Sequence, residues 1–352
     1  MKVSIIIVSY NAKHHLQLCL ESCLKATKHV SAEILVVDNN SQENVVEELK
    51  PLFPSVQFYA LKENLGFSKA NNYGVEQARG EFILILNPDT IIPEDLFDEL
   101  IPFYEAQSNP GMIGVRLVNA EGKFHPESKR NFPTLQNSFS KLFNVGSSKE
   151  SNYYNILLKE NEVGETSILV GAFMFLKRSI YQEIGGFDPR YFMYGEDIDI
   201  SYSCELAGYQ NYYKGDQIVL HYKGESTKKD KRYLKIFFEA MNLFVDKYYS
   251  KNTLKKNYMK MGIFVKYFIS WLHFSFQKNT QPENRVQKNE LCWLNHSSEF
   301  DVNQSKHFVL CTSKFTFKEI LEFIVQNNSP QISFYIHSHL SKKIIGTKGL
   351  IF

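Results

Sequence analysis

Short apolar segments alternate with helical segments through the first hundred residues, and this alternation constrains the fold more than any other feature. The apolar segments are 3–8, 33–37, 56–60 and 82–86, and the residues between them include the helical stretches 12–26 and 68–78. Strands that alternate with helices of about a dozen residues are typical of a parallel sheet covered on both faces. The sequence therefore predicts an α/β fold.

Three of the four apolar segments end in polar residues. Tyr10 and Asn11 follow the first segment, 38–41 (DNNS) follows the second, and 87–90 (NPDT) follows the fourth. In parallel sheets of this kind, ligands bind at the carboxyl ends of the strands. Asn, Asp and Pro also form turns, which would explain any one cluster. Three clusters together favour a binding site.

The common phosphate-binding loops are absent, because the sequence contains neither GxxxxGK[ST] nor GxGxxG after its first apolar segment. Side chains and a metal ion must then hold the phosphates of any bound nucleotide. Asp38 can accept a hydrogen bond from the imide of a pyrimidine base, or it can cap the next helix. Asp89, just after Pro88, is either a ligand for Mg²⁺ or Mn²⁺ or a turn residue.

Three acidic residues, Glu196, Asp197 and Asp199, lie at the start of a predicted helix over 196–207. An ionised carboxylate in a cleft can take a proton from an attacking hydroxyl group, which is general-base catalysis. Acidic residues are also favoured at helix starts, although this explains one or two better than three. His221 follows a predicted strand and either completes a metal site with Asp89 or is structural.

The part of the chain after residue 110 is less regular. A strand is predicted over 166–176, and the polar stretch 147–162 is interpreted as a long loop or lid. Residues 279–288 are interpreted as a linker. After it, 308–312, 315–326 and 331–336 predict a small β-α-β unit without recognisable chemistry.

An amphipathic helix is predicted from residue 233, and the segment that follows is both basic and aromatic. Between Lys247 and Pro282 there is no acidic residue but there are seven lysines, interleaved with Phe, Tyr and Trp. This composition is typical of a helix that lies in a membrane interface. A packed helix with a solvated lysine face is the alternative. No apolar stretch is long enough to suggest a membrane-spanning helix.

Composition narrows the function classes further. Lys and Arg (40) nearly balance Asp and Glu (38), and the net charge of +2 argues against a nucleic-acid-binding protein. The five cysteines form no CxxC pair, and an odd number of them is expected to be reduced thiols. The first residues do not resemble a signal peptide. A cytoplasmic protein is therefore expected.

A set of short motifs appears in order along roughly residues 1–250. They are 8–11 (VSYN), 36–41 (VVDNNS), 64–74 (NLGFSKANNYG), 86–90 (LNPDT), 171–173 (GAF), 185–188 (GGFD), 194–199 (YGEDID) and His221. Each motif alone is weak, but the ordered set resembles family 2 glycosyltransferases of the GT-A fold, particularly the bacterial rhamnosyltransferase-like branch.

The resemblance implies a mostly parallel, Rossmann-like sheet with helices on both faces. The expected division is a GT-A domain over 1–230, with a nucleotide-binding half (1–110) and an acceptor and catalytic half (111–230). Amphipathic helices (231–280) and a small α/β unit of unknown role (289–352) follow.

The resemblance also implies roles for individual residues. The pocket for the base and ribose would contain Tyr10, Asn11, Asp38 and Asn40, and the loop and helix beneath the donor would contain Asn64, Gly66 and Asn71.

Residues 87–89 match the DxD motif of the family, with Asp89 as ligand to Mg²⁺ or Mn²⁺ and Asn87 in place of the first Asp. This departure leaves the metal with fewer carboxylates. Asp197 matches the catalytic base, and Glu196 is its acceptor-side neighbour. His221 matches a position that binds the metal or the diphosphate.

These roles imply an inverting hexosyltransferase that takes its sugar from a pyrimidine diphosphate sugar, either dTDP-rhamnose or a UDP-sugar. The expected acceptor is a lipid-linked glycan in bacterial surface polysaccharide or O-antigen synthesis. The enzyme would lie on the inner face of the plasma membrane, held by 247–278.

The two rival functions are a sugar-nucleotide pyrophosphorylase and a non-catalytic GT-A-like binding or scaffold protein. A sugar-nucleotide pyrophosphorylase needs a basic, glycine-rich loop after the first strand, and 11–13 reads Asn-Ala-Lys. A non-catalytic GT-A-like scaffold would not need Asp89, Asp197 and His221.

Overall fold

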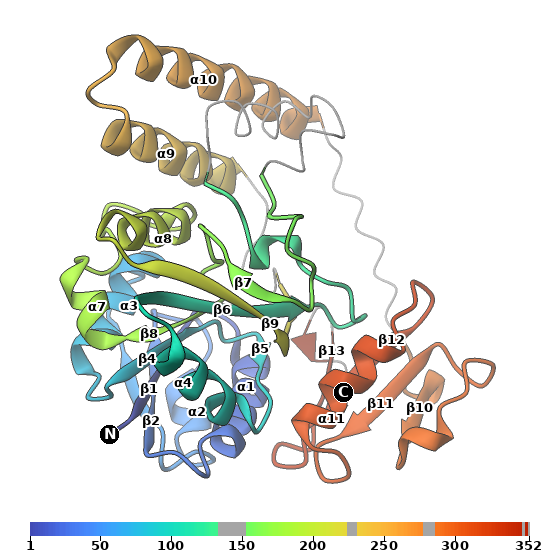
Figure 1. Cartoon of the computed structure of the whole chain (residues 1–352). Helices are drawn as coiled ribbons and strands as arrows, with labels where there is room; N and C mark the ends of the chain where they lie inside the picture. Colours follow the sequence, from blue (N-terminus) through green and yellow to red (C-terminus); the bar gives the residue numbers. More distant parts are fainter. Residues whose placement is uncertain (133–152, 224–230, 277–285, 347–348, 351–352) are drawn as a thin grey trace.

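The computed structural model describes residues 1–132, 153–223, 231–276, 286–346 and 349–350. These residues form a large sheet between helices, a helical hairpin above it and a second, smaller sheet beside it (Figure 1). The N-terminus lies at the large sheet, and the C-terminus belongs to the smaller unit.

Four parallel strands build the first half of the large sheet, in the order β3-β2-β1-β4. They are β1 (Val3–Ser9), β2 (Ala32–Asp38), β3 (Gln57–Ala60) and β4 (Phe82–Leu86), and the helices between them are α1 (Lys13–Ala26), α2 (Val45–Leu49) and α3 (Gly66–Gln77). All four predicted strands are confirmed to within two residues. Strands β1, β2 and β4 are almost wholly buried, as expected for a sheet covered on both faces.

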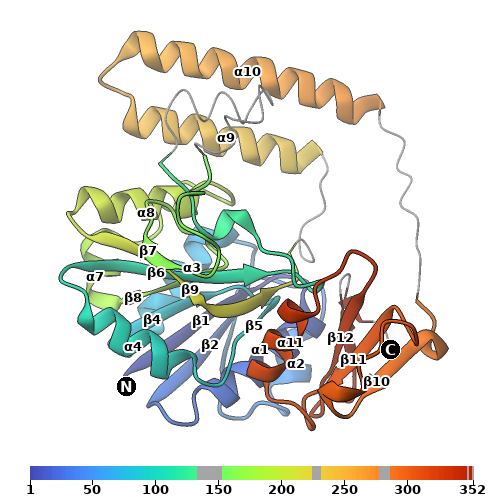
Figure 2. The same ribbon diagram turned by 45° about the vertical axis from the view of Figure 1, so that its right-hand side comes forward.

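The second half extends the sheet in the order β4-β8-β6-β9-β5, and β7 pairs with β9. Its elements are β5 (Thr90–Ile91), α4 (Leu96–Ala106), β6 (Pro110–Val118), β7 (Val163–Glu165), β8 (Phe173–Lys177), α7 (Arg178–Glu183), α8 (Glu196–Leu206) and β9 (Gln210–His221). Strand β8 runs antiparallel to both neighbours, whereas β6 and β9 are parallel. Helices α1, α2 and α4 lie on one face and α8 on the other (Figure 2).

The strand predicted over 166–176 is wrong in its first part, because β8 begins only at Phe173. Ile168 forms a single bridge with Arg130, and Leu169 N–H donates to the Ser201 hydroxyl of α8. The Leu169 side chain lies over Gly114 of β6, so these apolar residues are buried although, apart from the single bridge, they are not paired in the sheet. Of the predicted loop, 153–162 contains no helix or extended strand, and 147–152 lie outside the described residues.

Two helices, α9 (Lys231–Tyr248) and α10 (Thr253–Phe276), form the hairpin, which lies above α8 (Figures 1 and 2). They pack through a small apolar cluster of Leu234, Phe238, Val245 and Ile263. Among the described residues, no helix is both long and apolar enough to cross a membrane. The predicted linker lies largely outside the described residues, which resume at 286.

The C-terminal unit is a five-stranded sheet with one long helix. It contains β10 (Leu291–Leu294), β11 (His307–Cys311), α11 (Phe317–Gln326), β12 (Ser333–His337), β13 (Ile344–Gly346) and β14 (Gly349–Leu350). The predicted β-α-β pattern is confirmed. Its core is continuous with Leu18 of α1 and with Ile91 and Leu220 of the large sheet.

Polar contacts strengthen this junction. The buried Glu21 carboxylate of α1 accepts hydrogen bonds from the hydroxyls of Thr312 and Ser338, both at 2.5 Å. The Glu94 carboxylate accepts from the backbone N–H groups of Phe317 and Lys318 at the start of α11. A carboxylate at a helix N-terminus satisfies unpaired N–H groups and the helix dipole.

Candidate active site

The strand register brings the polar segments together at one edge of the large sheet. Ser9 is paired with Asp38, and Ile7 is paired with Leu86. The residues that follow β1, β2 and β4 therefore emerge side by side. They line an open cleft of about 1840 Å³, whose other walls come from α8, α9 and α10. Small-ligand sites are typically ~300–1000 Å³, so this cleft has room for two substrates.

Most of the residues that the sequence singled out line this cleft. They are Tyr10, Asn11, Asn64, Gly66, Asn87, Asp89, Glu196, Asp197 and His221. Three others are absent from its lining. Asp38 is buried and accepts a hydrogen bond from the Ser41 backbone, Asn71 is buried and donates to the Phe67 carbonyl within α3, and Asn40 is exposed. Burial raises the pKa of Asp38.

Asn39, which sequence reasoning did not single out, organises the loop before α3 at one side of the cleft. Its side-chain amide donates to Asn64 Oδ1 at 3.0 Å and to the Gly66 carbonyl at 3.2 Å, and its oxygen accepts from Leu65 N–H. Gly66 has φ +79°, and a Cβ there would lie 2.4 Å from the Phe192 carbonyl oxygen. Only glycine fits here without a displacement of the Phe192 backbone.

Asn11 connects the loops after β1 and β2. Its backbone N–H donates to the Ser41 hydroxyl at 2.9 Å, and its side-chain oxygen accepts from Gln42 N–H at 2.8 Å. Asn11 and Asn40 both have positive φ, of 51° and 64°. Asn tolerates this conformation better than most residues, which gives the two loops their tight turns.

Asp89 and His221 meet because β5 pairs with the end of β9, where Thr90 is opposite His221. His221 Nε2 lies 3.4 Å from an Asp89 carboxylate oxygen and 3.4 Å from Asn87 Nδ2. Burial alone would raise the pKa of Asp89, but the neighbouring His221 lowers it below its usual value. Behind them, burial and the nearby His221 lower the pKa of His125 to about 4.

These residues suit a divalent cation that is shared with a bound diphosphate. Mg²⁺ and Mn²⁺ are commonly held by one or two carboxylates together with substrate phosphates. Asp89 supplies a buried, ionised carboxylate at the cleft, and His221 supplies a ring nitrogen. Within the described part of the chain, no group of three His, Cys, Asp or Glu side chains is arranged to hold a metal alone.

The predicted base, Asp197, is held by a buried cation that the sequence did not reveal. Arg130 Nη2 lies 2.6 Å from the Asp197 carboxylate, and both side chains are largely buried. Arg130 also donates to the Leu169 carbonyl at 2.8 Å. A lone Arg 67 residues before its partner carries no local signal, so only the fold identifies this pair.

Glu196 is buried beside Asp197 and lines the cleft. Burial, and then the negative charge of Asp197, raise the pKa of Glu196 well above its usual range. Among the described residues, no group hydrogen-bonds its Oε2 atom. Glu196 is thus a carboxyl group with a raised pKa and hydrogen-bonding capacity at the cleft, while Asp197 next to it is paired with a cation.

The sequence of residues 4–185, just over half of the 352-residue chain, matches the family described as Glycosyl transferase family 2. The N-acetylglucosaminyl-diphospho-decaprenol L-rhamnosyltransferase of Mycobacterium tuberculosis is 27% identical over 241 residues, covering 64% of this chain and 78% of the relative. Rhamnosyltransferase WbbL of Escherichia coli K12 is 28% identical over 230 residues, and the match covers 62% of this chain and 83% of the relative.

Among solved structures, the mannosyltransferase PcManGT from Pyrobaculum calidifontis, in complex with GDP-Man and Mn²⁺, has a TM-score of 0.51. It is 16% identical, and the match covers 77% of this chain and 75% of that chain. This likeness concerns the fold, which is the expected GT-A fold. The sequence match and the curated relatives show that the chain belongs to glycosyltransferase family 2, in its rhamnosyltransferase-like branch.

Proposed function

We propose that this glycosyltransferase moves a hexose, with inversion at the anomeric carbon, from a pyrimidine diphosphate sugar to a hydroxyl group of a glycan acceptor. The observation that carries the proposal is the arrangement of one cleft. Asp197, fixed by Arg130, and the Asp89–His221 pair both line it. A base and a diphosphate site in one cleft are what a single displacement requires.

In this mechanism Asp197 accepts the proton of the acceptor hydroxyl as its oxygen attacks the anomeric carbon. Arg130, at 2.6 Å, balances the charge of the carboxylate and fixes its direction. Glu196, in its neutral form, can donate a hydrogen bond to the acceptor. Glycoside hydrolases instead place two carboxylates on either side of the bond they cleave.

The other end of the cleft stabilises the departing nucleoside diphosphate. Asp89 and His221 would hold the divalent cation, which, when bound, neutralises the charge of the diphosphate. The Asn39–Asn64–Gly66 contacts hold the loop on which the donor rests. Pre-set groups of this kind lower the barrier because they need no rearrangement during the reaction.

The donor we propose is dTDP-rhamnose, with a UDP-sugar as the alternative, and the acceptor is a lipid-linked glycan in bacterial surface polysaccharide or O-antigen synthesis. The names of two relatives support this choice, since both are rhamnosyltransferases and one acts on a diphospho-decaprenol acceptor. A non-catalytic binding or scaffold protein with the same fold is the rival function.

Binding of dTDP and UDP, measured by calorimetry with and without Mn²⁺, tests the donor site. We expect Mn²⁺-dependent binding of at least one nucleotide, weakened by about tenfold or more in Asp89→Ala. Asp98→Ala, an exposed carboxylate on α4, is the matched control and should bind as the wild type does. Unchanged binding by Asp89→Ala would refute the metal role. No binding by the folded wild type would favour the scaffold.

We also propose that α10 lies on an anionic membrane surface. Large apolar side chains are exposed along it, including Leu254, Met261, Phe264 and Phe268. The helix contains four lysines and no acidic residue. An exposed apolar face with flanking lysines matches the chemistry of a lipid interface with anionic headgroups.

The sequence assigns the lysines of 247–278 to a membrane surface, but the structure shows that several of them form ion pairs within the protein. Lys247 is paired with Asp188 and Asp199, and Lys256 and Lys260 are paired with Asp246 of α9. The charges of these three lysines are therefore compensated by carboxylates of the protein itself, so they are not available solely for binding lipid headgroups. Lys278 lies outside the described residues. A test based on Lys256 or Lys260 would therefore also loosen the hairpin.

Flotation with vesicles that contain anionic lipid gives a cleaner test. We expect Met261→Asp/Phe264→Asp, which places two acids on an exposed face that is 60% and 67% accessible, to lower the bound fraction by about tenfold or more. The control Leu52→Asp/Leu340→Asp introduces the same charges at exposed apolar positions elsewhere. Equal binding by wild type and both variants would rule out α10 as the membrane contact.

A further inference from the structure

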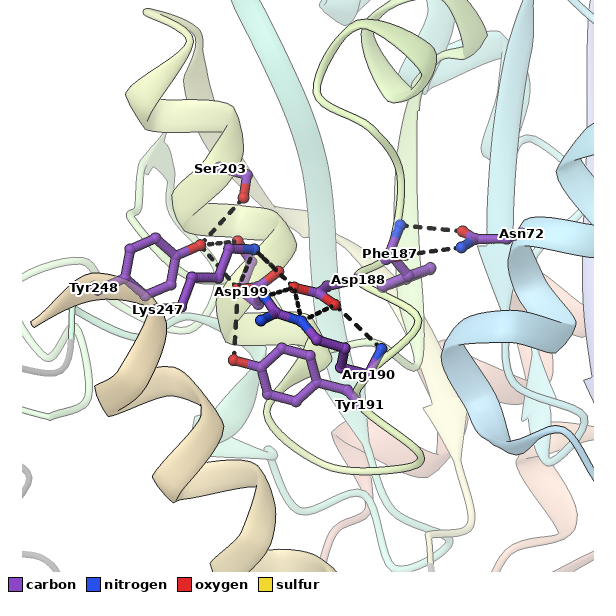
Figure 3. A network of polar contacts seen from close by, with 9 residues as sticks. All are labelled: Asn72, Phe187, Asp188, Arg190, Tyr191, Asp199, Ser203, Lys247 and Tyr248. Atoms are coloured by element: carbon purple, nitrogen blue, oxygen red, sulfur yellow. Dashed lines mark hydrogen bonds and ion pairs between the residues drawn. The ribbon is translucent and has the colours of Figure 1, made fainter. Parts of the chain in front are cut away.

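Lys247, in the last turn of α9, bridges two carboxylates of the catalytic domain (Figure 3). Its Nζ atom lies 2.8 Å from the Asp199 carboxylate and 3.2 Å from Asp188 Oδ2. The Asp199 side chain is 1% exposed and the Asp188 side chain 10%. One ammonium group thus compensates two carboxylates that are mostly withdrawn from water.

The two carboxylates mark the ends of the segment that carries the proposed base. Residues 188–199 contain Glu196 and Asp197 between them. Asp188 is also bound by the Arg190 guanidinium, with Nε at 2.9 Å. These bonds, Arg190 first and then Lys247, hold the pKa of Asp188 well below its usual range. Lys247 therefore joins both ends of this segment to one point on α9.

Neighbouring hydroxyl groups complete the network (Figure 3). The Tyr248 hydroxyl donates to the Asp199 carboxylate at 2.8 Å, and the Tyr191 hydroxyl lies 3.5 Å from it. Ser203 of α8 lies 3.2 Å from the same Tyr248 oxygen. The end of α9 thus contacts the first turns of α8, the helix that begins with Glu196 and Asp197.

The segment between these anchors has a conformation that needs support. Tyr194 and Gly195 both have positive φ, of 71° and 78°, directly before Glu196. A non-glycine residue in this region is strained and persists only when its surroundings hold it there. The Tyr194 ring packs against Tyr233 and Phe237 of α9, with centroids 5.1 and 6.0 Å away. Helix α9 therefore supports the segment at two separate places.

We propose that Lys247 is a positioning residue for sugar transfer: by bridging Asp188 and Asp199 it holds residues 188–199 in the conformation that presents Asp197 to the acceptor. This rests on the proposed function of Asp197. It makes α9 part of the catalytic apparatus, although the sequence places α9 after the catalytic motifs.

The test compares full-length wild type, Lys247→Met, Lys247→Arg and the control Lys235→Met, which removes an exposed lysine of α9 that is paired with Glu239 of the same helix. Two quantities are measured. One is hydrogen–deuterium exchange of the 188–199 peptides. The other is hydrolysis of dTDP-rhamnose or UDP-glucose, in which water replaces the glycan acceptor and takes the sugar, followed as release of dTDP or UDP. Circular dichroism verifies that each variant is folded.

We expect Lys247→Met to speed exchange in 188–199 by about tenfold or more, and to lower kcat by on the order of 100-fold with KM for the donor nearly unchanged. Lys247→Arg keeps the positive charge, so its exchange rate in 188–199 and its kcat should both stay close to the wild-type values. Exchange or kcat in Lys247→Met that matches Lys235→Met would overturn the proposal. If the wild type turns over neither donor, the proposed function fails instead, and the exchange data alone decide whether Lys247 orders the segment.

Discussion

Asp197→Asn is expected to reduce sugar transfer by on the order of a thousandfold, with the affinity for the donor nucleotide nearly unchanged. The amide has the shape of the carboxylate but cannot accept the acceptor proton. Transfer is measured with dTDP-rhamnose or a UDP-sugar, and affinity by calorimetry. Equal transfer by mutant and wild type would show that catalysis at Asp197 is not the function.

A second variant separates the chemical role of Asp197 from its structural role. Arg130 is buried and its ion pair with Asp197 is short, so Asp197→Asn leaves a buried cation without its carboxylate. Breaking a buried pair typically costs about 3–5 kcal/mol. Arg130→Gln in the Asp197→Asn background removes that cation. We expect the double variant to have a free energy of unfolding closer to that of the wild type than Asp197→Asn has, and to be as inactive in sugar transfer as Asp197→Asn.

Phe317→Ala is expected to destabilise the whole protein, at a cost of about 3–5 kcal/mol in the free energy of unfolding. Phe317 is fully buried where α11 meets the large sheet, and Lys25 of α1 lies 4.7 Å from its ring centre. Its cluster also contains Leu18, Ile91 and Leu220 of the catalytic domain. A cavity there weakens both units together.

Urea unfolding followed by circular dichroism measures this effect. Leu340→Ala, at an exposed position of the same unit, is the control and should change the midpoint little. Removal of residues 289–352 should be still more damaging, because it uncovers the apolar side chains of α1, β5 and β9. A truncated chain with the wild-type midpoint would show that the C-terminal unit is an independent appendage.

The local part of the fold was predictable from the sequence. Continuous apolar runs such as 82–86 are strands because a sheet covered on both faces buries every residue, and polar motifs mark their ends. The failure at 166–176 has a clear cause. Ile168 and Leu169 are buried, but apart from one bridge to Arg130 they are not paired in the sheet, and burial without strand pairing leaves the same apolar pattern.

The candidate site was predictable where residues sit in motifs and not where they act at a distance. The sequence singles out Asp89, Asp197 and His221, and the fold brings all three to one cleft. Arg130 was missed because its partner lies 67 residues away. Lys247 was assigned to a membrane surface from composition alone, whereas the fold pairs it with two buried carboxylates.

The sequence by itself determined the four parallel strands of the first half, the order of the motifs and the family, since these depend on short-range periodicity and on residue types at fixed spacing. Only the tertiary structure decided which charges are paired and what the last hundred residues contact. Glu21 with Thr312, and Lys247 with Asp199, are contacts between segments far apart in the chain. Their partners are chosen by burial, because a charge withdrawn from water must be paired wherever the fold places it.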